Sequence, residues 1–258
     1  MFTIFAKTGD HLRIGIAIVL ATSFAMTAFL LNWLTLSGAQ SASVLGTIAY
    51  GLGNWQMALL MLIFFISASL LSKDIHANDE RLTIKFRRTS GQVWANGFWF
   101  ALWLIIWFIT QEIMFIAAAA ASIATANADT WATEVGNKSK GTTYLITTFE
   151  KVKTNTSGGI SVQGSLAAIT GSLLIAFVFW ITAENATILW FLIITLAGVA
   201  GCFFDSYLGA RIEGCNYKVK FFPKHKEHTI IINNNNVNWI AVGSSSIIVL
   251  LITLITKI

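Results

Sequence analysis

The segment Ala128–Lys138 contains the side chains of this sequence that are best suited to chemistry. It reads ADTWATEVGNK, so two carboxylates, Asp129 and Glu134, stand close to Lys138. The segment follows the apolar run Ile113–Ala126, and its charges therefore fall where hydrocarbon would meet water. Ionisable groups are costly in that position and mark candidate functional sites. We predict a metal- and phosphate-handling centre, with Asp129, Glu134 and Lys138 as candidate catalytic residues. The alternative is a helix end with solvated acids.

A second carboxylate, Asp205, is a candidate partner for Asp129. Asp129 and Glu134 are five positions apart, which is roughly 140° around an ideal helix, so these two need not share a face. Asp205 ends an apolar run and opens the segment DSYLGAR. Hard cations such as Mg²⁺ prefer carboxylate and phosphate oxygens. Asp129 and Asp205 are therefore the predicted metal ligands. The alternative for Asp205 is an acid at an ordinary water boundary.

Glycine and basic residues supply candidate phosphate ligands. The run SGGIS, Ser157–Ser161, precedes an apolar span, and glycines at a helix start free backbone N–H groups for an anion. Glycine also serves as simple punctuation before helices, and Arg88 is equally suited to anchor a span at the membrane surface. Amides near span ends, as at Asn96 and Asn238, need either a neighbouring helix or a ligand as partner. The predicted phosphate-binding residues are Arg88, Asn96, Thr148, Lys151, Gly158, Gly159, Ser161 and Asn238.

The composition predicts a helical membrane protein. The chain is 55% hydrophobic and only 11% charged, whereas a soluble domain carries about 25% charged residues. A single proline and long apolar runs favour helices over a barrel. We therefore expect an all-α, polytopic bundle of about seven to eight transmembrane helices that forms one domain over residues 1–258. The expected spans are 11–33, 55–71, 91–109, 113–126, 160–181, 186–204 and 237–255, with 41–53 undecided.

The positive charges predict which face is cytoplasmic. Polar segments 73–90, 127–159 and 205–236 hold 14 of the 17 Lys and Arg residues, whereas the tight turns at Glu112 and Glu184 hold none. Cytoplasmic segments are enriched in Lys and Arg, so we place these three segments in the cytoplasm. The net charge of +5 is then explained by topology and anionic ligands, and we expect no nucleic-acid partner. The side of the N-terminus stays open, because the crossing of 41–53 is undecided.

Several motifs together resemble the transmembrane protein 19 family, also called domain of unknown function 92. The segment ADTWATEVG at 128–136 is similar to the family signature. Further similar segments are 34–39, 91–97, 146–148, 156–164, 205–210 and 234–238. Two positions depart from the pattern: Asn155 stands where the family usually has glycine, and Asn235 stands where aspartate is common. The second departure weakens a metal role for the cluster at 234–238.

The resemblance implies a membrane-bound phosphotransferase, because the family includes a plant phytyl-phosphate kinase. We expect a nucleotide-dependent kinase that converts an isoprenoid monophosphate to the diphosphate, with Mg²⁺ and a nucleoside triphosphate, either CTP or ATP. The expected partners are the lipid phosphate, the nucleotide and the bilayer. The pattern also resembles polyprenol kinases and lipid cytidylyltransferases. A transporter or flippase for an anionic lipid is the alternative from another class. The prenyl chain length and the oligomeric state stay open.

Overall fold

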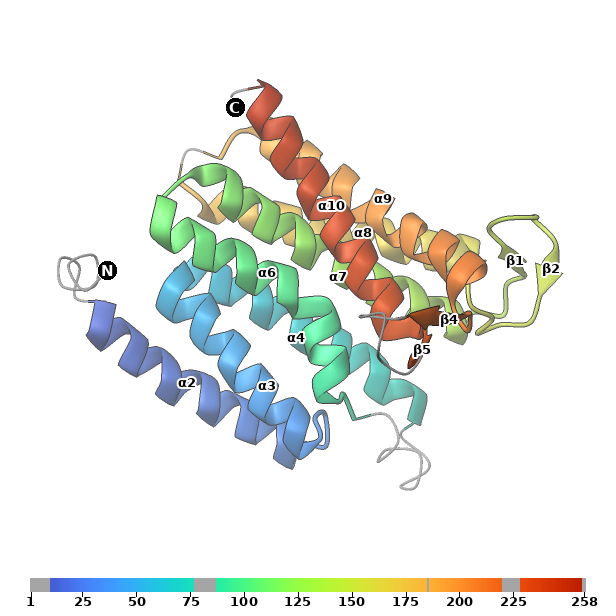
Figure 1. Cartoon of the computed structure of the whole chain (residues 1–258), viewed down its shortest axis with the longest axis horizontal. Coiled ribbons are helices and arrows are strands. Elements are labelled where there is room, and N and C mark those ends of the chain that lie inside the picture. The colour runs from blue at the N-terminus through green and yellow to red at the C-terminus, as the bar shows by residue number, and fades with distance from the viewer. Residues whose placement is uncertain (1–9, 77–86, 185, 220–227, 257–258) are drawn as a thin grey trace.

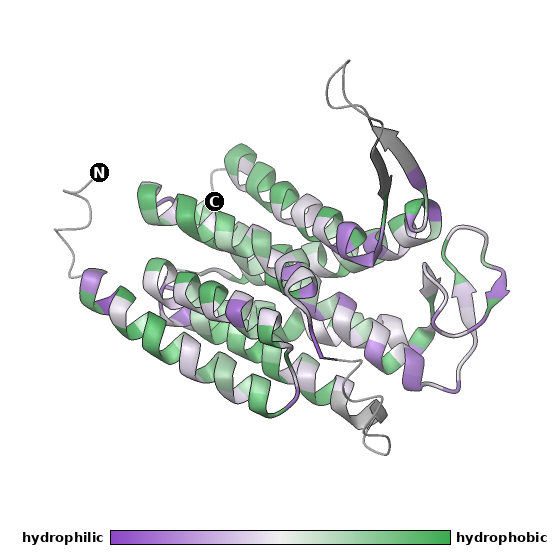
Figure 2. Ribbon diagram, turned by 60° about the horizontal axis from the view of Figure 1, so that its bottom comes forward, coloured by the Kyte–Doolittle hydropathy of each residue, from purple (hydrophilic) through white to green (hydrophobic). Residues whose placement is uncertain are grey.

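The computed structural model describes residues 10–76, 87–184, 186–219 and 228–256, and within them it is a bundle of helices with two small sheets (Figure 1). The helices are α2 (Asp10–Leu30), α3 (Leu36–Thr47), the π-helix η1 (Ile48–Gly53), α4 (Trp55–His76), α6 (Ser90–Thr110), α7 (Ile113–Lys138), α8 (Val162–Thr182), α9 (Ile188–Ile212) and α10 (Asn234–Thr256). This confirms the all-α class. Seven of these helices are long and apolar enough to cross a membrane. Figure 2 shows that hydrophilic residues gather toward the end of the bundle that carries the sheets.

The undecided segment forms the helices α3 and η1, which lead the chain back along α2. At one end the hydroxyls of Thr22 and Ser43 are 2.7 Å apart. At the other end Arg13 Nε donates to the carbonyl of Gly51 at 3.1 Å. The run is therefore antiparallel to α2, although it is shorter than the roughly 20 residues of a full span. As a result, α2 begins and α10 ends at the same end of the bundle, opposite the sheets (Figure 1).

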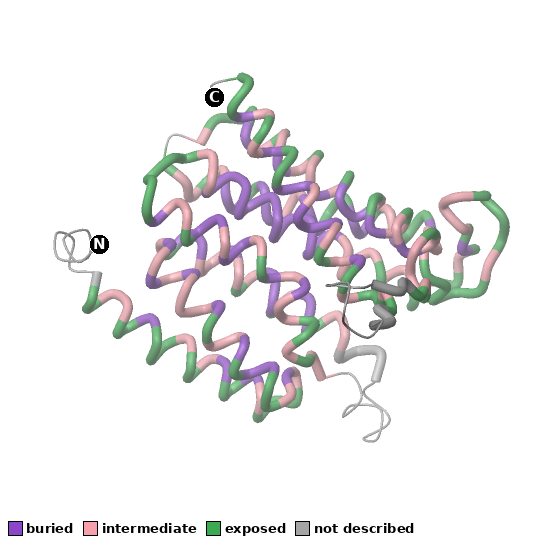
Figure 3. Tube along the Cα trace, in the orientation of Figure 1, coloured by how far each residue is buried: buried purple, intermediate pink, exposed green. Residues whose placement is uncertain are grey.

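Helix α7 is the centre of the bundle (Figure 3). Every residue from Ile116 to Ala128 is buried, and the helix packs against α4, α6, α8, α9 and α10. Alanine dominates this stretch, and small residues let neighbouring helices approach closely in lipid. On α9, a Cβ added to Gly198 would lie 3.0 Å from the Cβ of Ala124, and on α8 a Cβ added to Gly164 would lie 3.0 Å from the carbonyl oxygen of Ala132. Close packing around α7 therefore positions the neighbouring helices that carry site residues.

Two polar side chains in the core of α7 find partners on other helices. Thr125 and Ser245 share a hydrogen bond of 2.6 Å between α7 and α10. Asn127 Nδ2 donates to the carbonyl of Gly171 on α8 at 2.8 Å. A buried polar group without a partner would be costly, so these bonds specify how the helices sit against α7.

The predicted polar segments 127–159 and 205–236 begin too early. Residues 127–138 are the last three turns of α7, residues 205–212 are the last two turns of α9, and α10 already begins at Asn234. The sequence prediction ended each helix at its first polar residues, but those residues face a cavity inside the bundle, so the backbone stays helical. The predicted segment 73–90 likewise starts inside α4, and its residues 77–86 lie outside the described ranges.

Two small antiparallel sheets lie at the polar end. The first has the order β2-β1-β3, with strands β1 (Thr143–Leu145), β2 (Lys151–Val152) and β3 (Gly159–Ile160). In its register Tyr144 pairs with both Lys151 and Ile160. The second joins β4 (Asn216–Val219) to β5 (His228–Ile231). The first sheet brings the segment between α7 and α8 back toward the helix ends.

We predict that the two ends of α7 are accessible from opposite faces of the membrane. In a Cys215→Ser background, Thr154→Cys should react with a membrane-impermeant maleimide only from the cytoplasmic side, because its segment belongs to the Lys- and Arg-rich face. Glu112→Cys should react only from the other side. Cys202 is buried and serves as the unreactive control. Labelling of both positions from one side would contradict the crossing of α7.

Candidate active site

A polar cavity of about 500 Å³ lies at the end of the bundle that carries the sheets. Its wall is built from the C-terminal turns of α7 and α9, the first turns of α6, α8 and α10, and the segment 154–161. The volume falls within the range of roughly 300–1,000 Å³ that is typical of small-molecule sites. This cavity combines residues from more than half of the helices, so tertiary packing alone creates it.

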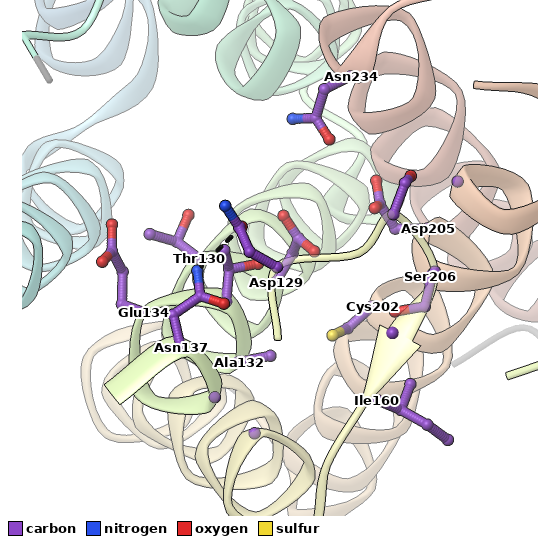
Figure 4. Close-up of a pocket in the computed structure, with 18 of the residues that line it drawn as sticks. Asp129, Thr130, Ala132, Glu134, Asn137, Ile160, Cys202, Asp205, Ser206 and Asn234 are labelled. Carbon is purple, nitrogen blue, oxygen red and sulfur yellow. Dashed lines mark hydrogen bonds between the residues drawn. The ribbon is translucent and has the colours of Figure 1, made fainter. Parts of the chain in front are cut away.

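Two carboxylates face this cavity from neighbouring helices. Asp129 lies on α7 and Asp205 on α9, and Figure 4 shows both pointing into the same space, with Asn234 of α10 on a third side. They lie close enough for their charges to interact. Asp205 is 8% exposed. Within the described residues neither carboxylate forms an ion pair with Lys or Arg. Two unpaired acids in a sheltered cavity favour the binding of a cation between them.

The amide of Asn238 fixes the position of Asp205. With its nitrogen facing the two available acceptors, Asn238 donates to Asp205 Oδ2 at 3.0 Å and to the carbonyl of Asn234 at 3.0 Å. These two bonds link α9 to the first turn of α10 at the cavity wall.

Three helix N-termini converge on the cavity. Gln92 of α6, Gly164 of α8 and Asn234 of α10 all line it from the first turn of their helices. Helix N-termini carry partial positive charge and unpaired N–H groups, which favour anions. The same cavity therefore offers a place for a cation at the carboxylates and a favourable field for phosphate at the helix starts.

Local sequence explains why these helices start where they do. Thr89 and Gln92 form a reciprocal capping box at α6. The side chain of Ser161 accepts from Gly164 N at α8. Asn233 and Asn236 cap α10 reciprocally, with both bonds 3.1 Å long. The asparagine run is therefore a capping motif at the start of α10. Asn234 and Asn235, which lie between the two capping residues, line the cavity.

Glu134 and Arg88 form a separate part of the wall. Glu134 accepts a hydrogen bond of 2.5 Å from Ser72 Oγ on α4, and Figure 4 shows it on the far side of the cavity from Asp205. Burial lowers the pKa of Arg88 to about 10, while the charge of Glu134 acts in the opposite direction. Arg88 is therefore positively charged at neutral pH, and its charge is lost only as the pH rises through about 10.

Gly158 lets the loop after β2 pack against α9. Its φ is +76°, and an added Cβ would lie 2.7 Å from the backbone nitrogen of Ala210. The neighbouring Gly159 N donates to the Thr156 carbonyl at 2.9 Å and belongs to β3. In the predicted phosphate cradle at Gly158–Ser161, the N–H of Gly159 is therefore already used and the side chain of Ser161 caps α8, while the phosphate-binding role of these residues stays a prediction.

The cavity brings together most of the residues predicted from the sequence. Those that line it are Arg88, Asn96, Asp129, Glu134, Gly158, Gly159, Ser161, Asp205 and Asn238. Three others lie outside its wall. Lys138 Nζ donates to the Leu71 carbonyl at 2.8 Å, Thr148 bonds Glu150 in a turn, and Lys151 is exposed on β2. Lys138 stands nine positions after Asp129 on the same continuous helix, which holds the two side chains apart. The predicted loop over this segment would have allowed them to approach each other.

Sequence reasoning missed several residues of the wall. Ser72 holds Glu134 from the end of α4, and Glu213 accepts a hydrogen bond from Ser157 across the loop. Gln92 stands one turn before Asn96 on α6, and this spacing is the one signal that pointed to it. Nothing in the sequence separates Ser72 from other serines at span ends.

The donor set of the cavity fits a magnesium ion that is shared with a ligand. Among the described residues no group of three or more His, Cys, Asp or Glu side chains is arranged to hold a metal ion by itself. Mg²⁺ is commonly bound through one or two carboxylates together with substrate phosphates. Asp129 and Asp205 match that pattern, whereas a structural zinc site with four protein ligands does not.

Fold and cavity together define a polytopic helical membrane protein with a polar site at one membrane face. The chain belongs to the family described as Integral membrane protein DUF92, whose sequence profile matches residues 19–246. No solved structure matches the chain.

Relatives cover nearly the whole chain. It is 27% identical over 273 residues to Protein PGR of Arabidopsis thaliana, which covers 92% of this chain and 94% of that protein. It is 30% identical over 245 residues to the Uncharacterized membrane protein MJ0933 of Methanocaldococcus jannaschii, covering 93% and 94%. A shorter match, 32% over 133 residues, relates it to Protein VTE6, chloroplastic, of A. thaliana, covering 50% of this chain and 35% of that protein.

We predict that Gly158→Ala destabilises the protein through both backbone strain and a clash with α9. An alanine at positive φ costs more than about 1 kcal/mol, and the clash with Ala210 adds to this. Gly214→Ala is the matched control, since Gly214 has φ +79° but nothing within 4 Å of an added Cβ. The melting temperature in detergent should therefore fall further for Gly158→Ala than for Gly214→Ala. Equal losses would show that the loop does not pack on α9.

Proposed function

We propose that this protein is a nucleotide-dependent kinase that phosphorylates an isoprenoid monophosphate to the diphosphate at the cytoplasmic face of the membrane. One observation carries the proposal: two carboxylates without an ion-pair partner among the described residues, a partly buried arginine and three helix N-termini converge on one polar cavity. This combination suits a metal ion and several phosphate groups at once. The family resemblance, which includes a plant phytyl-phosphate kinase, supports an isoprenoid acceptor.

The proposed reaction requires little covalent chemistry from the protein itself. An oxygen of the lipid monophosphate forms a bond to the γ-phosphorus, and the bond between that phosphorus and the β,γ-bridging oxygen breaks. The nucleoside diphosphate leaves with the electron pair, and the acceptor needs no proton removed when it is a dianion. Catalysis then consists of positioning and charge neutralisation. A site with Asp, Arg, Asn and helix N-termini, and with no histidine among the described residues of its wall, is consistent with that demand.

The residues of the wall divide into two groups. Arg88 and Asn96 would hold the acceptor phosphate, because a guanidinium makes paired hydrogen bonds to phosphate oxygens. The starts of α8 and α10 would face the phosphates of the nucleotide. Asp129 and Asp205 would hold Mg²⁺, which neutralises charge on the transferred group. Asn238 would keep Asp205 in place through the bond described above.

The proposed kinase should yield a defined product. Purified protein with Mg²⁺ and geranylgeranyl or phytyl monophosphate is offered each nucleoside triphosphate, and the lipid product is weighed by mass spectrometry. We expect a gain of one phosphate, and Asp129→Asn should lower the rate by roughly two orders of magnitude. A gain of a nucleoside monophosphate would identify a cytidylyltransferase instead. No product from folded protein, together with flux of the lipid phosphate across vesicles, would identify a transporter.

Magnesium should stabilise the protein through the two aspartates even without turnover. At a concentration of 100 times Kd, a ligand raises the free energy of unfolding by about 2.7 kcal/mol. We expect a rise of the melting temperature with Mg²⁺ for the wild type and none for Asp129→Asn or Asp205→Asn. Both variants should melt higher than the wild type without Mg²⁺, because repulsion between the acids is relieved. Glu112→Gln, at the opposite end of the bundle, is the control and should keep the response.

A further inference from the structure

A second cavity, of about 340 Å³, lies between α2, α3, η1, α4 and α6 and is lined mainly by apolar side chains. Its apolar wall consists of Ala17, Leu20, Ala21, Phe24, Ala42, Leu45, Gly46, Ala49, Ala58, Met61, Leu62, Phe64, Phe65, Val93 and Gly97. We call this space the apolar groove. Its helices are distinct from α7, α8, α9 and α10, which build most of the polar cavity.

The apolar groove meets the polar cavity at three residues. Arg88, Gln92 and Asn96 line both spaces. The guanidinium of Arg88 lies 5.8 Å from the ring centre of Phe64 and 5.5 Å from that of Phe65, and both rings belong to the groove wall. A cation is therefore held at the junction, with hydrocarbon on one side and the polar cavity on the other.

We propose that the apolar groove binds the part of one prenyl chain that is nearest its phosphate, with that phosphate at Arg88. This inference rests on the proposed function, since it places the acceptor lipid of that reaction. The substrate carries one phosphate monoester on one apolar chain. The protein offers one cation, Arg88, at the end of one apolar groove. The shared residues would carry the phosphate directly into the polar cavity.

The shape of the apolar groove favours a single branched chain. On α2 it extends from Phe24 to Ala17, which is about 10 Å along a helix axis. Beyond Ala17 by about one helical turn, Arg13 donates to the carbonyl of Gly51, so a polar contact follows the apolar wall at this end. Alanine and glycine on facing helices leave room for methyl branches. A groove of this length takes only part of a long prenyl chain, so the remaining chain would lie in the bilayer.

The bilayer has direct access to the apolar groove. Leu20 on α2 and Leu62 on α4 belong to its wall and stay 58% and 37% exposed, so neighbouring helices do not cover them. A prenyl chain can therefore enter sideways between α2 and α4. This route lets the substrate reach the site without leaving the membrane.

Photolabelling without nucleotide tests the groove independently of catalysis. The probe is geranylgeranyl monophosphate with a diazirine in its second isoprene unit, added to full-length protein in phosphatidylcholine vesicles. We expect adducts on 17–24, 42–50 and 58–65, which unlabelled geranylgeranyl monophosphate prevents and phosphatidic acid does not. Adducts on the outer faces of α8 or α9, or equal competition by phosphatidic acid, would overturn the inference.

A pair of variants on α3 supplies the second test. Ala42→Phe places a ring in the groove and should lower labelling, and raise the KM for the prenyl monophosphate, about tenfold. The KM for the nucleotide should not change. Val44→Phe is the matched control, because Val44 is 48% exposed and lies outside the wall. Equal effects of the two variants would contradict the inference.

The two tests separate the groove from the reaction. Groove labelling without any kinase product would support the groove and refute the proposed function. Kinase product together with labelling elsewhere would refute the groove and leave the proposed function standing.

Discussion

The close packing of α7 within the bundle is the constraint on which the remaining structure depends. A helix buried on all sides must present small side chains to its neighbours and must pair each polar group that it carries. The run of alanines meets the first demand, and the bonds of Thr125 to Ser245 and of Asn127 to Gly171 meet the second. These contacts place α8, α9 and α10 around the last turns of α7. The carboxylate of Asp129 then faces Asp205 without any direct bond between them.

The bundle divides its interior into spaces of different polarity. Helices α7 to α10 and the first turn of α6 surround the polar cavity, whereas α2, α3, η1, α4 and α6 surround the apolar groove. Helix α6 belongs to both walls, and its Asn96 lies at their junction. Such an arrangement lets a lipid keep its chain in an apolar environment while its head group reaches a polar site. Reactions at membrane surfaces need this arrangement because the two halves of the substrate prefer different solvents.

Sequence reasoning placed the spans better than the ends of the helices. Long apolar runs were sufficient to predict about seven to eight spans, with 41–53 undecided, because the cost of burying polar groups in lipid acts on each span separately. The ends of α7 and α9 were misplaced for the same reason. Asp129 and Asp205 signal water, and in this protein the water lies in a cavity inside the bundle. A polar residue therefore marked the site and not the end of the helix.

The sequence by itself determined the class of protein, the number of long apolar helices to within one and most of the residue types at the site, since these depend on local hydrophobicity and on motifs such as ADTWATEVG. Tertiary structure decided which of those residues meet. It placed Asp129 beside Asp205 and placed Glu134 on another part of the wall, near Ser72 and Arg88. It left Lys138 and Lys151 outside the cavity wall. It also created the apolar groove, to which five helices contribute. The physical reason is that packing between helices sets the distance between residues far apart in the chain, and no single segment contains that information.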